Sequence, residues 1–220
     1  AKGQTYSNFI QVIVDDCSTD NTIESAKKAI GNDSRFVLVE RQKKTGTLQG
    51  HIIAAEYDYC EEDIFVHLDG DDWFSSEGVL HRLNQIYQDN NIWCTYGNYE
   101  TTDGTSSVCK PIEDFILPPR LYLIKGWIFS QVRSFRGRLW RGIDEEDFLS
   151  VDGSYFSIAD VAVFCPILEM AGFERVRFVP EVQMIYNRET PLNDDKINRE
   201  LVIKHAIEIA RRTPKELWKN

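Results

Sequence analysis

Acidic residues gather at two places in the sequence, each directly after a short apolar run. Asp69–Asp72 follows the run 64–68, and Asp15 and Asp16 follow the run 9–14. Three carboxylates within four residues repel one another, so the cluster at 69–72 is stable only if it is solvated, partly protonated or neutralised by a metal ion. Carboxylate oxygens suit Mn²⁺ or Mg²⁺, which often bridge substrate phosphates. We therefore predict a divalent-cation site here, with a solvated loop as the alternative.

Other acidic and phosphate-binding motifs do not fit the same residues. An EF-hand loop beginning at Asp69 would need an oxygen ligand at the position of Trp73, glycine at Phe74 and glutamate at Leu80. A phosphatase motif of the form D-x-D-x-T also fails at Trp73. Neither the G-x-x-x-x-G-K-[ST] loop nor the G-x-G-x-x-G loop is present. Phosphate would have to be held by another arrangement.

Alternating elements are predicted to position these acids. Strands are expected at 9–14, 35–40, 64–68 and 92–99, with helices at 22–30, 47–59 and 77–88 between them. This alternation predicts an α/β fold with a mostly parallel sheet covered on both faces. Ligands of such sheets bind beyond the carboxyl ends of the strands, so both acidic segments should face one crevice.

The second half has a less regular pattern. Helices are predicted at 130–141, 158–170 and 193–212, and strands at 176–179 and 182–186. Pro166 should kink or divide the second of these helices. The arginines between Arg133 and Arg141 either contact a ligand or pair with the acids at 144–147, and the second interpretation is favoured because arginines beside acids usually pair.

Composition limits the classes of partner and compartment. The net charge of −10 over 220 residues disfavours nucleic acid, because an acidic surface repels the phosphate backbone. Five cysteines without a C-x-x-C spacing disfavour disulfides and a zinc site, and they favour a reducing compartment. No apolar run reaches the ~20 residues of a transmembrane helix. We expect one compact domain over 1–220 in the cytoplasm or at the cytosolic face of a membrane, in an oligomeric state that the sequence does not predict.

Two segments resemble one known family. The stretch from Gln4 to Thr22, with Asp15-Asp16 near its centre, and the stretch from His67 to Phe74 are similar to motifs of the family-two GT-A glycosyltransferases. The resemblance covers most of the chain. It implies a GT-A fold, in which a mixed, mostly parallel sheet is flanked by helices. Residues 1–100 would form the Rossmann-like half that binds the nucleotide-sugar, and 101–220 the half that binds the acceptor.

The resemblance also implies a role for individual residues. Asp15 matches the acid that hydrogen-bonds uracil, and Asp16 lies beside it. Asp69 and Gly70 lie in the motif that contacts the ribose or the metal, and Asp71 matches the principal metal ligand. Two later positions complete the set: Asp160 matches the general base, with a helix N-cap as the alternative, and Asn187 matches a late metal or phosphate contact.

The implied activity is transfer of a hexose from a nucleotide-sugar donor, UDP-linked in particular, to a hydroxyl of a glycan, protein or lipid-linked acceptor. The anomeric centre would be inverted with Mn²⁺ or Mg²⁺ as cofactor. Two rival functions stay open. One is a sugar nucleotidyltransferase, and the other is a catalytically inactive nucleotide-binding or scaffolding module.

Two departures from the family pattern bear on the donor site. Relatives carry a first strand of the form V-S-I-I-I-P-x-Y-N, which lies in the sheet beside the nucleotide, and residues 1–220 lack it. Cys17 stands where the family usually has glycine, which predicts a negative φ at this residue or a different turn.

Overall fold

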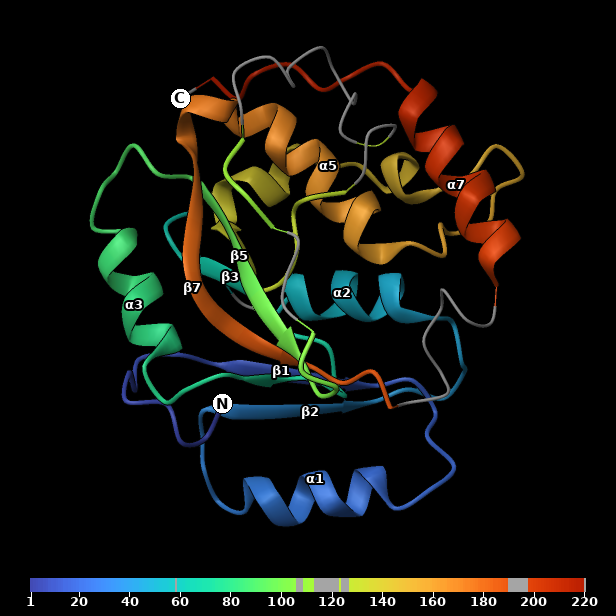
Figure 1. The fold of residues 1–220 in the computed structure, drawn as a ribbon. Helices are drawn as coiled ribbons and strands as arrows, with labels where there is room; N and C mark the ends of the chain where they lie inside the picture. Colours follow the sequence, from blue (N-terminus) through green and yellow to red (C-terminus); the bar gives the residue numbers. More distant parts are fainter. Residues whose placement is uncertain (58, 106–108, 113–122, 124–126, 190–197, 220) are drawn as a thin grey trace.

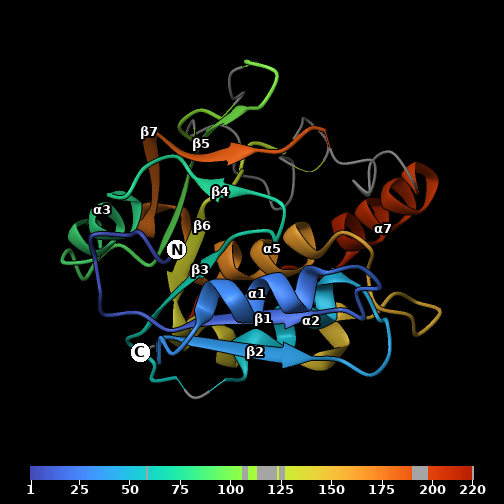
Figure 2. The ribbon, with the colours of Figure 1, turned by 90° about the horizontal axis from the view of Figure 1, so that it is seen from below.

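The computed structural model describes residues 1–57, 59–105, 109–112, 123, 127–189 and 198–219. Within these ranges the chain forms two sheets with helices on both sides (Figures 1 and 2). The predicted helix at 193–212 falls partly outside the described residues, and its described part is α7 (Arg199–Arg211). No helix in the described ranges is both long and apolar enough to cross a bilayer.

The smaller sheet carries the first acidic segment. It pairs β1 (Gln11–Asp15) with β2 (Phe36–Glu40) in parallel, from Gln11 opposite Phe36 to Asp15 opposite Glu40. Helices α1 (Thr22–Ile30) and α2 (Thr47–Ala55) lie on opposite sides of this sheet (Figure 1). The predicted strand–helix–strand–helix order is therefore confirmed, with α2 ending earlier than expected.

The larger sheet has five strands in the order β3-β6-β5-β7-β4. Its longest register, between β5 and β7, is parallel, whereas β3–β6, β5–β6 and β4–β7 are antiparallel. The strands are β3 (Ile64–His67), β4 (Trp73–Phe74), β5 (Cys94–Thr101), β6 (Arg133–Arg136) and β7 (Val176–Tyr186). The two strands predicted at 176–179 and 182–186 are thus one strand, with a register shift against β5.

The core is centred on α5 (Ala159–Ala171), which packs against α2 and β5. Phe164, Ile167 and Leu168 are fully buried on this helix. A helix that is apolar on nearly every side has to be surrounded by other elements, which explains its central place. Pro166 lies inside the helix, which continues on both sides of it rather than dividing. Helix α3 (Val79–Ile86) connects the second acidic segment to β5.

The predicted helix at 130–141 is wrong. This segment forms β6, followed by the 3₁₀ helix η2 (Gly137–Gly142). Strand β6 is buried between β3 and β5, and the Ser134 hydroxyl lies 2.6 Å from Thr95 Oγ1 and 2.9 Å from the Tyr87 hydroxyl. Pairing on both edges and buried hydroxyl contacts overrode the local preference, as tertiary context often does.

In the part of the chain that the structure describes, no strand pairing joins the two sheets. Among the described residues, β1 pairs only with β2, and β3 pairs only with β6, so each has one open edge. A cavity of about 1950 Å³ lies between these edges and is lined by both strands. The apolar side chains of β1 and β3 are mostly half-buried, although strands of this composition are usually covered on both faces.

Candidate functional site

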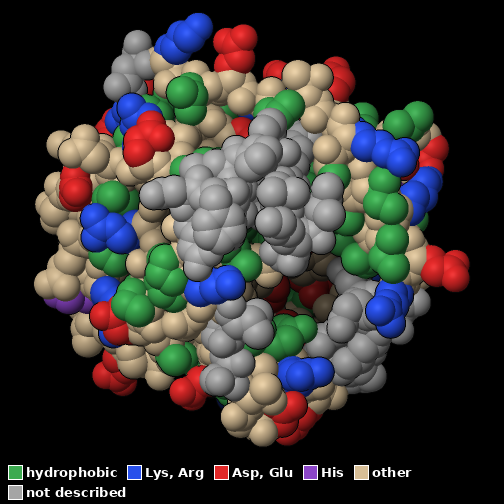
Figure 3. All heavy atoms as spheres, turned by 45° about the horizontal axis from the view of Figure 1, so that its top comes forward, with side chains coloured by type: hydrophobic (Ala, Val, Ile, Leu, Met, Phe, Trp, Pro, Cys, Tyr) green, Lys and Arg blue, Asp and Glu red, His purple; other side chains and the backbone are tan. Residues whose placement is uncertain are grey.

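Both acidic segments line the cavity between the two sheets. Asp15 and Asp16 reach it from the end of β1, and Asp69–Asp72 reach it from the loop after β3. The structure therefore brings together the two segments that the sequence placed at strand ends. A recess with acidic side chains at its floor is visible in Figure 3.

The acids after β1 are held by hydrogen bonds from nearby backbone amides and by an ion pair with Arg41. Asp15 is buried, and its Oδ2 accepts a hydrogen bond from the Ser18 amide at 3.0 Å. Asp16 accepts hydrogen bonds from the amides of Thr45 and Gly46 at 2.8–3.2 Å and lies 3.1 Å from Nη1 of Arg41. Burial opposes ionisation of Asp16, yet the two amides and the arginine outweigh it and lower its pKa. Asp16 thus fixes the loop before α2 at the cavity wall.

Cys17 adopts the conformation that glycine usually provides. Its φ is +63°, so the expectation of a negative φ is wrong, and the backbone keeps a left-handed residue at this turn. A side chain in this region is strained by roughly 1–2 kcal/mol. The Cys17 Sγ lies 3.1 Å from the carbonyl oxygen of Arg41, which follows β2. The side chain thus joins the turn after β1 to the residue after β2.

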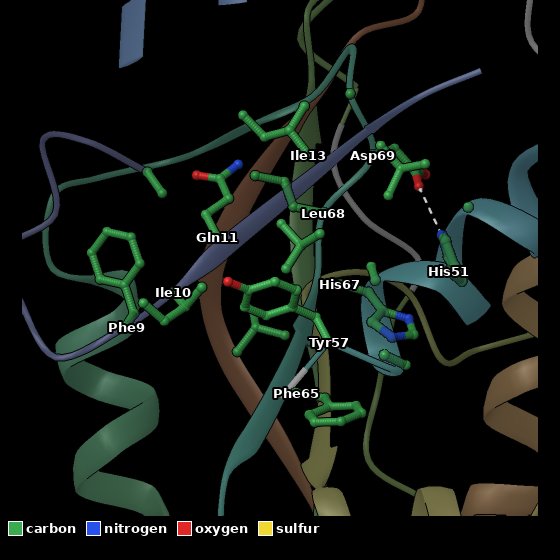
Figure 4. Close-up of a pocket in the computed structure, with 18 of the residues that line it drawn as sticks. Phe9, Ile10, Gln11, Ile13, His51, Tyr57, Phe65, His67, Leu68 and Asp69 are labelled. Atoms are coloured by element: carbon green, nitrogen blue, oxygen red, sulfur yellow. Dashed lines mark ion pairs between the residues drawn. The ribbon is translucent and has the colours of Figure 1, made fainter. Parts of the chain in front are cut away.

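Asp69 is held from two sides. The Gln131 side-chain amide donates to Asp69 Oδ2, and the Asp69 amide donates to Gln131 Oε1 at 3.3 Å. Asp69 Oδ1 lies 3.9 Å from Nε2 of His51 on α2, and Figure 4 shows these two side chains pointing toward each other. The His51 ring is 4.6 Å from the ring of His67 on β3. Burial lowers the pKa of both histidines, His67 most strongly, so both rings are neutral near pH 7.

The remaining acids of this loop are crowded. Burial, with the charge of Asp69 adding to it, raises the pKa of Asp71. Burial also raises the pKa of Asp72 to about 7, against the Asn187 amide, which donates to Asp72 Oδ1 at 2.9 Å. Asp72 therefore holds the backbone of Asn187 near the acidic loop. The side-chain oxygen of Asn187 accepts from the amide of Glu189.

Asp160 is the second residue of α5, after the N-cap residue Ile158 and Ala159. The alternative that Asp160 is the N-cap is therefore wrong. Its side chain is 37% exposed, so it is available to a ligand, and Oδ2 lies 3.4 Å from Nη1 of the buried Arg133. Asp160 is not among the described residues that line the cavity, although its charge, like that of Asp69, acts on His51.

The residues present suit a divalent ion in part. Asp69 and Asp71 offer carboxylate oxygens, and their crowding is relieved when a cation binds. In the described part of the chain, no group of three or more His, Cys, Asp or Glu side chains already forms a metal-binding cluster. Further ligands would have to come from a bound substrate, for example from phosphate oxygens.

The sequence did not predict that two buried residues contact the acids of the site, and it indicated the wrong partners for the other arginines. Gln131 and Arg133 lie in the segment that was predicted to be helical, where neither residue had a visible link to Asp69 or Asp160. The other arginines do pair with acids, but with Glu61 and Glu62 rather than with the acids at 144–147. No local pattern signals these pairs, since the partners are more than seventy residues apart.

Comparison with known proteins gives a consistent result. Residues 1–147 match the family model of glycosyl transferase family 2. The chain is 31% identical over 100 residues to an uncharacterized glycosyltransferase of Haemophilus influenzae, an alignment that covers 46% of this chain and 39% of that protein. It is 30% identical over 118 residues to the Escherichia coli UDP-Glc:alpha-D-GlcNAc-diphosphoundecaprenol beta-1,3-glucosyltransferase WfgD, with 54% and 43% of the two proteins covered. The chain thus spans less than half of each of these relatives.

Solved structures share the fold at low identity. The S. aureus TarS fragment 1–349 in complex with UDP superposes with a TM-score of 0.62 at 16% identity, over 97% of this chain and 60% of that one. The mannosyltransferase PcManGT from Pyrobaculum calidifontis, in complex with GDP-Man and Mn²⁺, gives a TM-score of 0.61 at 19% identity, over 98% and 59%. The GT-A fold expected from the sequence is confirmed.

Proposed function

The chain belongs to glycosyl transferase family 2, and we propose from this premise that it transfers a hexose from a nucleotide-sugar, UDP-linked in particular, to a hydroxyl acceptor. The observation that carries the proposal is the position of two acidic strand ends on one cavity. Asp15 and Asp16 lie there with Asp69 and Asp71, which are the residues that the family resemblance assigns to the nucleotide and the metal.

In the proposed donor site, different parts of the donor contact residues that follow strands of different sheets. Asp15 would bind the base, with Asp16 holding the adjoining loop, and Asp69 and Gly70 would lie against the ribose and diphosphate. The structurally similar TarS is known in complex with UDP, and PcManGT in complex with GDP-Man and Mn²⁺. Mn²⁺ or Mg²⁺, held by Asp69, Asp71 and Asn187, would neutralise charge on the departing diphosphate.

Asp160 is the proposed base. An acceptor hydroxyl is a weak nucleophile, and a carboxylate positioned beside it can take its proton as the new bond forms. The acceptor oxygen bonds to the anomeric carbon while the bond from that carbon to the diphosphate oxygen breaks. The nucleoside diphosphate leaves with the electron pair, the proton goes to Asp160, and the single displacement inverts the anomeric centre.

Turnover of a donor panel tests this function. With UDP- and GDP-linked hexoses, Mn²⁺ and a mixture of glycan and lipid-linked acceptors, we expect release of the nucleoside diphosphate that chelation of the metal abolishes. A sugar nucleotidyltransferase would instead release pyrophosphate from a nucleoside triphosphate and a sugar phosphate. Nucleotide binding without turnover of any donor would favour the inactive module and contradict the proposal.

The open edges of β1 and β3 bear on the completeness of the donor site. We propose that the space between them takes one further apolar strand, at the place where the family's first strand is expected. Two observations support this: among the described residues each strand has one edge without a strand partner, and the apolar side chains of both strands are mostly half-buried. A strand added to an exposed edge is stabilised by main-chain hydrogen bonds and by burial of alternate side chains.

Hydrogen exchange can test this strand site. We would fuse a strand-forming segment of alternating valine and threonine to Ala1 through a Gly/Ser linker, with a segment of alternating lysine and threonine as the control. Amides on the open edges of β1 and β3 should exchange about tenfold more slowly with the apolar segment, which corresponds to about 1.4 kcal/mol. Equal exchange in the two fusions would contradict the proposal.

A further inference from the structure

We infer that the segment Gln131–Arg133, at the start of β6, positions both reacting halves of the site: Gln131 fixes Asp69, and Arg133 fixes Asp160. This inference rests on the proposed function and deepens it. One short segment would then set the geometry of the acid at the donor and of the base at the acceptor, although the two acids lie in distant parts of the chain.

The side-chain amide of Gln131 makes two hydrogen bonds to the same residue, Asp69, one through its oxygen and one through its nitrogen. It is buried, its Nε2 donates to Asp69 Oδ2, and its Oε1 accepts from the Asp69 main-chain amide at 3.3 Å. This pair of contacts fixes the carboxylate relative to its own backbone. Oδ1 of Asp69 is left facing His51, at 3.9 Å. Carboxylates that hold metal ions are commonly oriented by such hydrogen bonds, and their loss weakens metal binding.

Arg133 differs from the other buried arginine of the same strand. Arg136 bonds through every guanidinium nitrogen: Nε to the Ile92 carbonyl, Nη1 to Glu62, and Nη2 to the Tyr87 and Asp89 carbonyls. This pattern is that of a structural arginine, whose donors are satisfied.

Arg133 has a less complete set of partners and a different environment. Nη1 contacts the Phe129 carbonyl at 3.1 Å and Asp160 at 3.4 Å, while the buried Nε lacks a hydrogen-bond partner among the described residues. A buried cation costs free energy unless it is well paired. Its charge acts on Asp72, His51 and His67 as well as on Asp160. Arg133 therefore provides a fixed positive charge close to the acids of the site.

The Gln131 half is tested by the affinity for UDP in the presence of Mn²⁺. In Gln131→Leu, which keeps the side-chain volume, we expect the apparent affinity to fall about 10- to 100-fold. Circular dichroism and Tm should confirm that the variant is folded. If the folded variant bound UDP with Mn²⁺ as tightly as the wild type, this inference would be wrong while the proposed function stood. If the wild type itself failed to bind any nucleotide, the proposed function would fall.

The proposed role of Arg133 is tested by measuring kcat and donor affinity separately in the same variants. Arg133→Met should lower kcat at least about tenfold with the affinity for UDP and Mn²⁺ within about threefold of wild type. Arg133→Lys, which keeps the charge, should recover part of kcat. Arg136→Lys is the matched control: it removes satisfied structural hydrogen bonds and should lower Tm without a specific loss of kcat. Unchanged kcat in Arg133→Met, or an equal loss of kcat in Arg136→Lys, would overturn the inference.

Discussion

Asp71→Ala is expected to remove most of the stabilisation of the protein by UDP with Mn²⁺. A ligand at a hundred times its Kd raises the free energy of unfolding by about 2.7 kcal/mol, which for a chain of this size is a rise in Tm of about 5–11 °C. If removal of the metal-binding carboxylate weakens binding a hundredfold, about 0.4 kcal/mol of that stabilisation remains. Thermal unfolding with and without UDP and Mn²⁺ measures the difference.

The same substitution should leave the ligand-free protein at least as stable as the wild type. Burial and the charge of Asp69 raise the pKa of Asp71, which means that its ionised form is disfavoured in the fold. Removing that charge therefore relieves repulsion at pH 7, which is typical of residues kept for function at a cost in stability. Glu216→Gln, at an exposed ion pair near the C-terminus, is the control. Full stabilisation of Asp71→Ala by UDP and Mn²⁺ would contradict the assignment of Asp71.

The acidic strand ends could be predicted because their signal is local. An apolar run followed by acids specifies both the strand and the place where its carboxylates are exposed, and β1 with Asp15 and β3 with Asp69 follow this rule. The alternation with helices then placed both ends on one cavity without further information. The place of these acids on one cavity was therefore predictable from the sequence alone.

The residues that position the acids of the site were not predictable, because their contacts join segments that lie far apart in the sequence. The 130–141 segment reads as a helix in isolation, and only its place between β3 and β5 makes it a strand. Gln131 contacts Asp69 across 62 positions, and Arg133 contacts Asp160 across 27. Cys17 shows the same limit at a single residue, since the turn after β1 keeps a positive φ that its side chain disfavours.

Asp160→Asn is expected to lower kcat by about 10²- to 10⁴-fold, the usual contribution of a positioned general base. Asparagine matches the shape of aspartate, and its side-chain oxygen can still accept from Arg133, so the start of α5 should remain intact. Stabilisation by UDP with Mn²⁺ should persist, because the donor is assigned to the acids after β1 and β3. Release of nucleoside diphosphate from the active donor of the panel measures the loss.

The combination of lost turnover and retained donor binding separates a base from a structural residue. Substitution of a residue needed only for folding would lower Tm, turnover and donor binding together. Substitution of the proposed base should affect only the proton transfer. Asp89→Asn provides a matched control, since this acid follows α3 and its side chain accepts a hydrogen bond from the amide of Asn91. Full turnover in Asp160→Asn would mean that another group accepts the proton, and Arg133 would then hold Asp160 for a structural reason alone.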